Sequence, residues 1–255
     1  MTAWNGLALR AFAEAAAVLG DDRYLSLAQG IAEFLTGQAT QGDRLLRSWR
    51  KGMPGPEGFC DDYAASALGM FALYQATGEE RWYLHGEHLT RTMIQRFADD
   101  TGGFFATASD GEQLIARPKN IHDNPTPSDN ALAAEALAVL AAYTGEPELY
   151  KRFERTIQSV GTSLSTHPGA HGHLLGVWLA NPLREVAVAG SPGDRQPFLD
   201  VAWGRFRPDV VLALGDGRMT SVPLLEGRPS GAGALAFVCR GFVCDLPAGS
   251  ASALL

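Results

Sequence analysis

The same short turn occurs three times in the chain, each time between two segments with the apolar spacing of an α-helix. A glycine ends the first segment, acidic residues follow, and an aromatic residue lies near the start of the next segment. The three copies are Gly20-Asp21-Asp22 before Tyr24, Gly78-Glu79-Glu80 before Trp82, and Gly145-Glu146-Pro147 before Tyr150. Glycine ends helices because it adopts the left-handed conformation without steric cost, and acids favour the N-terminus of the next helix.

This repeat predicts a run of antiparallel helical hairpins. They cover Leu7–Leu35, Asp61–Phe97 and Ser128–Leu164, and we expect the three aromatic residues to pack in the core. Two long connections, Gln38–Cys60 and Ala98–Pro127, separate the hairpins. Loops of this length usually carry structure or function, so we expect short strands in both.

Short extended runs mark these strands. One is Arg44–Trp49, and Gly103–Thr107 and Leu114–Arg117 flank Asp110-Gly111, a pair that suits a tight β-hairpin.

After Pro168 the pattern changes from hairpins to alternating strands and helices. The sequence predicts one more helix over His171–Leu179 and a crossover helix over Gln196–Trp203. Three apolar runs read as buried strands: Arg184–Ala189, Val210–Leu214 and Leu235–Cys239. The expected fold is therefore mainly α, with a helical-hairpin part over residues 1–180 and a small α/β element over residues 181–255.

Composition excludes several classes of protein. The 255 residues are 46% apolar, enough for a substantial core, and the formal net charge is -7, which disfavours nucleic-acid and anionic-membrane partners. No apolar run reaches the roughly 18 residues that cross a bilayer, and the N-terminus lacks the pattern of a secretory signal. We therefore expect a cytoplasmic protein without membrane or nucleic-acid partners.

The cysteines and clustered histidines do not form a familiar metal site. Three cysteines are too few for a disulfide framework, and Cys239 and Cys244 lack the usual redox spacing and further zinc ligands. We expect both to be structural and predict no metal and no cofactor, with a redox role as the alternative. His167, His171 and His173 lie among glycines and are interpreted as residues of a solvated loop.

Polar motifs stand at the start of each hairpin. They are Trp4-Asn5-Gly6, Asp61-Asp62-Tyr63 and Ser128-Asp129-Asn130. The first helices of antiparallel hairpins run parallel, so their N-termini should meet at one pocket mouth. Helix capping explains each motif singly, but a cap needs only one residue, and the surplus favours a ligand.

The segment Arg117–Asp123 precedes the third motif and adds cations, an imidazole and an acid. Two acids flanking a glycosidic bond are the hydrolase arrangement, so Asp62 and Asp123 are the predicted catalytic pair, with His122 as a further proton carrier. The acid cluster is too short for a magnesium–diphosphate site. The predicted sugar-binding residues are Trp4, Asn5, Asp61, Tyr63, Arg117, Lys119, Ser128 and Asn130.

Several of these residues together resemble a known family. The motifs are Trp4–Leu7, Arg44–Ser48, Gly58–Ala64, Gly102–Phe105, Arg117–Lys119, Asp123, Pro127-Ser128 with Asn130, and the Cys239/Cys244 pair. From Trp4 nearly to its end, the chain is similar to the C-terminal part of a thioredoxin-domain-containing family that includes spermatogenesis-associated thioredoxin-like proteins and their bacterial relatives. Asp129 departs from the pattern, which usually has a small residue there.

The resemblance implies a fold and a partner. Members carry a thioredoxin-like domain followed by an (α/α)6 toroid similar to six-hairpin glycosidases and N-acylglucosamine 2-epimerases. This chain would then be a truncated part, an incomplete toroid without the thioredoxin-like domain and the early hairpins, which would be its partners, or it would self-associate in their absence. The implied function is carbohydrate metabolism, as a sugar epimerase or isomerase or a glycosidase-like enzyme. The alternative is a non-catalytic scaffold for the thioredoxin-like domain.

Overall fold

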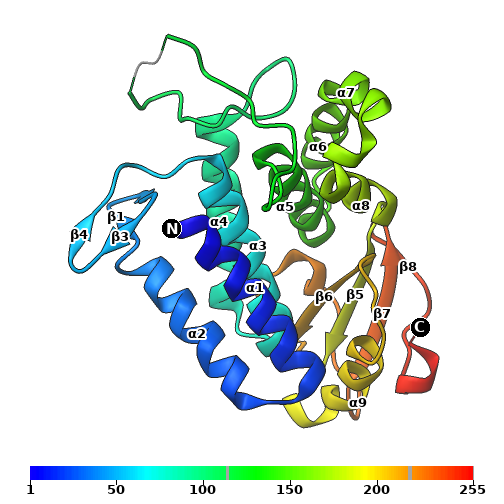
Figure 1. Ribbon diagram of the computed structural model, residues 1–255. Helices are drawn as coiled ribbons and strands as arrows, with labels where there is room; N and C mark the ends of the chain where they lie inside the picture. The colour runs from blue at the N-terminus through cyan, green and yellow to red at the C-terminus, as the bar shows by residue number, and fades with distance from the viewer. Residues whose placement is uncertain (113–114, 218–219, 255) are drawn as a thin grey trace.

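The computed structural model describes residues 1–112, 115–217 and 220–254, and the fold is mainly α-helical, as predicted. Its helices form the three expected hairpins (Figure 1). α3 packs closely against α1 and also contacts α5. The pairs are α1 (Thr2–Leu19) with α2 (Asp22–Thr36), α3 (Cys60–Thr77) with α4 (Glu80–Phe97), and α5 (Asp129–Thr144) with α6 (Pro147–Ser159).

The glycines of the repeated turn end their helices as the sequence predicts. Gly20, Gly78 and Gly145 have left-handed φ angles of 63°, 73° and 70°. Each donates its backbone N–H to the carbonyl of the residue four positions earlier, which satisfies one of the free carbonyls at the helix end.

The residues after these glycines behave less uniformly. Asp21 caps α2 by accepting a hydrogen bond from the Arg23 N–H, whereas Glu79 and Glu146 make no side-chain cap. Trp82 is buried, but Tyr24 is only half-buried and Tyr150 is 36% exposed, so the prediction that all three turn aromatics pack in the core is confirmed for Trp82 alone.

The third hairpin is interrupted near its end. α6 stops at Ser159, and a separate short helix, α7 (Gly161–Thr166), continues the segment predicted as one helix to Leu164. α8 (Gly172–Ala180) follows and matches the predicted extra helix within one residue.

The connections contain small hairpins rather than long strands. In the first, β1 (Thr40–Gln41) pairs with β2 (Arg44–Leu45), and β3 (Trp49–Arg50) pairs with β4 (Met53–Pro54). In the second, the run 103–107 carries only an isolated bridge between Phe104 and Ala98. Leu114, the first residue of the expected partner run, lies outside the described residues, and positions 115–117 form no strand. The hairpin predicted around Asp110-Gly111 is therefore not formed in the part of the chain that the structure describes.

A small sheet follows the helices, with strand order β6-β5-β7-β8. β5 (Arg184–Ala189) runs parallel to β6 (Val210–Gly215) and antiparallel to β7 (Leu235–Arg240), and β8 (Val243–Cys244) completes the edge. The crossover between β5 and β6 is α9 (Pro192–Trp203). α9 begins four residues before the predicted Gln196 because Ser191 caps it and Pro192 occupies its first turn.

The helices also complete the hydrogen bonds of the sheet edge. The Tyr74 hydroxyl donates to the Leu214 carbonyl (3.1 Å) and accepts from the Leu214 N–H (2.9 Å). Tyr143 donates to the Leu212 carbonyl, and Gln75 accepts from the Leu212 N–H, both at 2.9 Å. Side chains of α3 and α5 thus satisfy the outer edge of β6, which would otherwise expose unpaired backbone groups.

The two faces of the sheet join different cores. Ala187, Val211 and Ala213 belong to the large core that continues through the helical hairpins. Val188 and Leu214 face a second core that includes Phe198 of α9. No helix in the described part of the chain has the length and apolar character needed to span a membrane.

Candidate functional site

The starts of α1, α3 and α5 meet at the end of the helical layer opposite the sheet (Figure 1). The Ala3 N–H of α1 donates to Asp62 of α3 at 2.8 Å. The negative charge of Asp61, at the start of α3, raises the pKa of Asp129, the first residue of α5. Residues that are distant in the sequence therefore lie together, as the parallel first helices predict.

Asp62 is fully buried and holds three segments in place. Its carboxylate accepts from the backbone N–H groups of Ala3 and Phe59, each at 2.8 Å, and from Arg47 at 2.9 Å. Burial, with the nearby charge of Asp61, raises the pKa of Asp62 to about 6 against the opposing effect of Arg47. With these partners, Asp62 has the surroundings of a structural carboxylate.

Asp61 and Asp129 line one cleft of about 550 Å³ between the starts of α3 and α5. Asp61 forms a 2.5 Å ion pair with Arg47. Asp129 is buried, and its carboxylate accepts a 2.9 Å hydrogen bond from Asn120. Burial and the charge of Asp61 raise the pKa of Asp129 to about 7. Two carboxyl groups in one cleft thus have different environments, one ion-paired and one stabilised in its protonated form.

The rest of the cleft is mostly polar. Lys119 and His122 are predicted site residues that line it, and Asn120 and Asn124 lie beside them. Lys119 is held by Asp99 and by the Gly102 carbonyl, each at 2.6 Å. The cleft contains Asp61, Lys119, Asn120, Ile121, His122, Asn124, Thr126, Pro127, Ser128 and Asp129.

The side chains of two further predicted residues form hydrogen bonds with backbone groups. The Asn130 amide accepts from the Phe104 N–H (2.8 Å) and donates to the carbonyls of Phe104 and Asn120. The buried Tyr63 hydroxyl accepts from the Leu45 N–H at 3.0 Å. These side chains anchor the two long connections to the helix starts.

Asp123, predicted as the second catalytic acid, also makes backbone contacts. Its two oxygens accept from the N–H groups of Ser128 and His173, each at 2.8 Å, which ties the start of α5 to the first turn of α8. The sequence predicts that Asp123 and Asp62 form the catalytic pair of acids. Neither Asp123 nor Asp62 lines the cleft, which contains Asp61 and Asp129 instead.

The histidine segment is more ordered than a solvated loop. His171 is completely buried, and its Nε2 lies 2.9 Å from the Ser163 hydroxyl, which also contacts His122 at 3.0 Å. His173 pairs with Glu135 at 2.8 Å. The loop interpretation is therefore wrong for His171, which is buried against Ser163, and for His173, which Asp123 and Glu135 hold, and it holds for the exposed His167. The described residues contain no cluster that would bind a metal ion.

Of the other predicted residues, Ser128 lines the cleft, whereas Trp4, Asn5 and Arg117 are not among its lining residues. Trp4 is 64% exposed, and Asn5 donates to the Met1 carbonyl at 2.7 Å within α1. Ser128 caps α5 by accepting from the Ala131 N–H. The Arg117 guanidinium lies 4.2 Å from the Phe105 ring and donates to the Thr107 carbonyl.

Sequence reasoning missed Asp129, Asn120 and Arg47 as site residues. Asp129 carried a signal, because it directly follows the cap residue Ser128 in a motif with more polar residues than a cap needs. Arg47 belongs to the motif Arg44–Ser48, but only folding places it against Asp61 and Asp62.

The comparisons with known proteins point to one group of relatives. The chain is similar to spermatogenesis-associated protein 20. It is 28% identical to the human protein over 269 residues, 97% of this chain and 34% of that protein. The mouse protein is also 28% identical, over 237 residues that cover 87% of this chain and 30% of the relative. No protein-family model matches.

A protein of Caenorhabditis elegans whose name describes it as uncharacterized is 23% identical, over 97% of this chain and 36% of its own length. The chain therefore spans about a third of the length of the curated relatives it matches. These similarities agree with the resemblance to the spermatogenesis-associated proteins.

A second cleft, of about 470 Å³, lies between the helices and the segment after α9. Its walls are mostly apolar, and its buried polar centre is Glu135, which accepts from Arg10 (2.7 Å) and pairs with His173. Burial opposes the charge of Glu135, but Arg10 and His173 outweigh it and lower its pKa to about 2. Because Glu135 is already paired with Arg10, the first cleft is the better candidate for chemistry.

Lowering the pH from 8 to 6 should stabilise the protein. Asp62 and Asp129 have folded-state pKa values of about 6 and 7, above the ordinary 3.8, so the folded state binds protons that the unfolded state releases. By linkage, these groups should add about 2 kcal/mol to the unfolding free energy at pH 6 relative to pH 8. His85, whose pKa burial lowers, opposes this gain towards the lower pH.

Urea unfolding at fixed ionic strength measures the effect. Asp129→Asn should remove most of the pH dependence, because Asp129 has the higher of the two pKa values. An unfolding free energy that is unchanged or lower at pH 6 would show that neither carboxyl group takes up a proton in the fold.

Proposed function

We propose that the cleft between the starts of α3 and α5 binds a neutral sugar and that Asp61 and Asp129 exchange protons with it. One observation carries this proposal: the two carboxyl groups share a cleft but differ in environment. Asp61 is ion-paired with Arg47, whereas burial raises the pKa of Asp129 to about 7. An acid and a base with separate protonation states are what epimerisation, isomerisation and glycoside hydrolysis each require.

The chemistry of the cleft supports a sugar as the ligand. Asn120, Asn124, Thr126 and Ser128 supply amide and hydroxyl groups, which both donate to and accept from sugar hydroxyls. Lys119 is already paired with Asp99, and the net charge of -7 disfavours a polyanionic substrate, so a neutral sugar fits the cleft better than an acidic one. In this proposal the catalytic residues are Asp61 and Asp129, and Asp62 positions Arg47.

The hairpin arrangement fits the proposed enzyme class. α1 and α5 pack on either side of α3, and each has its returning helix, an order that is compatible with part of an (α/α)6 toroid. From the similarity to the longer proteins, we propose that the chain forms part of a toroid, acts in carbohydrate metabolism and has a thioredoxin-like domain as its partner.

The scaffold function is the second candidate, and a separate observation favours it. Asp62, Tyr63, Asp123 and Asn130 all satisfy backbone groups, so much of the predicted site is structural. α1 also exposes Trp4, Val18 and Leu19, large apolar side chains that a partner domain or a second copy of the chain would cover.

Sugar binding and the Asp129→Asn variant separate the two functions. We expect saturation-transfer NMR with a panel of neutral mono- and disaccharides to detect binding. Asp129→Asn keeps the shape of the side chain but cannot donate the acidic proton, so turnover of a bound sugar should fall by about 100-fold while binding persists.

The control is Asp245→Asn, a change at an exposed aspartate after β8 that should alter neither property. A panel without binding to this chain or to a full-length relative, together with an Asp129→Asn variant that differs only in stability, would favour the scaffold function instead.

A further inference from the structure

The β7–β8 hairpin holds a disulfide that joins a buried and an exposed sulfur. Cys239 and Cys244 are direct partners in the antiparallel pair and are bonded to each other. Cys239 is 1% exposed, whereas Cys244 lies at the surface. An incoming thiolate can therefore reach Cys244 while Cys239 is shielded.

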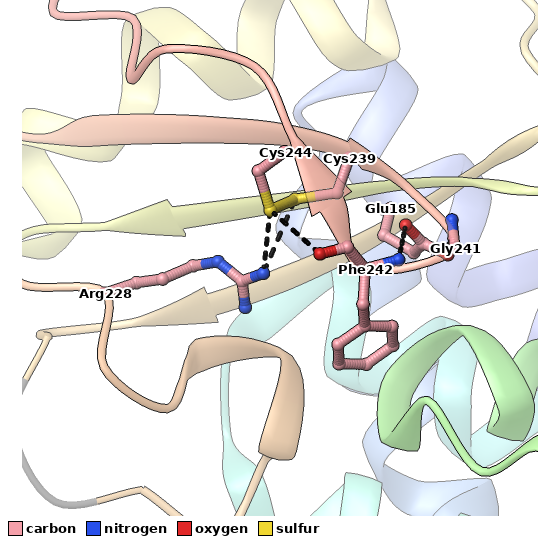
Figure 2. The surroundings of a disulfide bond; sticks show 6 residues. All are labelled: Glu185, Arg228, Cys239, Gly241, Phe242 and Cys244. Atoms are coloured by element: carbon pink, nitrogen blue, oxygen red, sulfur yellow. Dashed lines mark hydrogen bonds between the residues drawn. A yellow bond between two sulfur atoms is a disulfide. The ribbon is translucent and has the colours of Figure 1, made fainter.

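A half-buried arginine lies against both sulfurs. Nη2 of Arg228 is 3.0 Å from Cys244 Sγ and 3.4 Å from Cys239 Sγ (Figure 2). Within residues 1–112, 115–217 and 220–254, the charge of Glu185 acts on Arg228 but no carboxylate lies at ion-pair distance from it, and the two sulfurs are the hydrogen-bond acceptors that its guanidinium meets. A partly buried cation normally has an anionic partner. The sulfurs become anionic only when the disulfide is reduced to thiolates.

The hairpin does not depend on the disulfide alone. The Glu185 carboxylate of β5 accepts from the N–H groups of Gly241 (3.0 Å) and Phe242 (3.2 Å) in the turn. Phe242 packs against Gly145 at the end of α5 and contacts the large core. These contacts would keep the two cysteines near each other after the sulfur–sulfur bond opens, so the pair could be reoxidised without unfolding.

We propose that Cys239, Cys244 and Arg228 form a thiol–disulfide exchange site that accepts electrons from a dithiol. A thiolate of the dithiol attacks Cys244 Sγ, a mixed disulfide forms, and the Cys239–Cys244 bond breaks with Cys239 leaving as a thiolate beside Arg228. The second thiol of the donor, after losing its proton, attacks its own sulfur in the mixed disulfide and releases Cys244 as a thiolate. The donor becomes a disulfide, the protein gains two electrons, and the protons lost by the donor go to solvent or to the new thiolates.

Replacing Arg228 tests the role of its charge. The probe is dithiothreitol under native conditions, with alkylated thiols quantified by peptide mass spectrometry so that the buried Cys60 is counted separately. Arg228→Gln should slow reduction about tenfold and shift the equilibrium towards the disulfide, because a nearby cation stabilises the leaving thiolate. Arg228→Lys keeps the charge and should retain most of the rate.

Arg240→Gln is the matched control, because Arg240 is an exposed arginine in β7, the strand that also contains Cys239. It should react like the original protein. Equal rates for Arg228→Gln and the control, reduction only in denaturant, or a pair that oxidised dithiothreitol cannot oxidise would each overturn the proposal.

Discussion

Replacing Gly6 by alanine should lower the unfolding free energy by about 3 kcal/mol, the upper part of the range for overpacking a core. α1 and α3 touch backbone to backbone at this position. A Cβ atom on Gly6 would lie 2.5 Å from the Ala65 carbonyl carbon and 2.6 Å from the Ser66 nitrogen, and Gly69 approaches the Gly6 carbonyl in the same way. Because both neighbours are helix backbone, the two helices would have to separate.

Gly30 provides the matched control, since it is an exposed glycine in α2 with open space around the added methyl group. Gly30→Ala should be neutral or stabilise the protein by up to about 1 kcal/mol through helix propensity. Urea unfolding followed by circular dichroism measures both variants. Equal effects of Gly6→Ala and Gly30→Ala would show that α1 and α3 are not packed this closely.

Replacing Asp62 by alanine should cost roughly 3–5 kcal/mol of stability, the range for breaking a buried charged pair. The change would leave the N–H groups of Ala3 and Phe59 without acceptors and would remove the buried partner of Arg47. Each uncompensated polar group adds its own desolvation cost. The start of α1 would lose its attachment to α3, so the loss should also appear as faster hydrogen exchange near Ala3.

Asp61→Ala is the control, because Asp61 shares Arg47 but its side chain is 19% exposed and it lines the cleft. That variant should lose about 1 kcal/mol or less. Thermal unfolding of both variants at pH 8 distinguishes the roles of the two aspartates. If Asp62→Asn instead abolished sugar binding without a measurable change in melting temperature, Asp62 would be a ligand-binding residue, as the sequence hypothesis holds.

Local chemistry made most of the secondary structure predictable. Gly20, Gly78 and Gly145 end their helices because no tertiary contact is needed to favour glycine in the left-handed region. The strand Arg184–Ala189 was predicted with its observed bounds, since a short apolar run between turn residues has few alternatives. Boundaries failed where a cap or a break decided them, as at Ser191 and Val160.

The relative roles of the site residues were not predictable in the same way. The sequence placed polar residues at three helix starts, and the parallel first helices predicted that they would meet. The sequence could not show which carboxylates would accept hydrogen bonds from backbone N–H groups, because Asp62 and Asp123 receive these donors from segments distant in the sequence. The cleft therefore contains Asp61 and Asp129 rather than the predicted pair.

The sequence by itself determined the mainly helical fold, the three hairpins and the strands of the tail, because helix ends and apolar periodicity act over a few residues. Only the tertiary structure decided the attachment of β6 to Tyr74 and Tyr143, the burial of Asp129 and the position of Arg228 beside the disulfide. Burial and charge pairing depend on which distant segments come together, and a carboxyl group or a thiol acquires its reactivity from those neighbours.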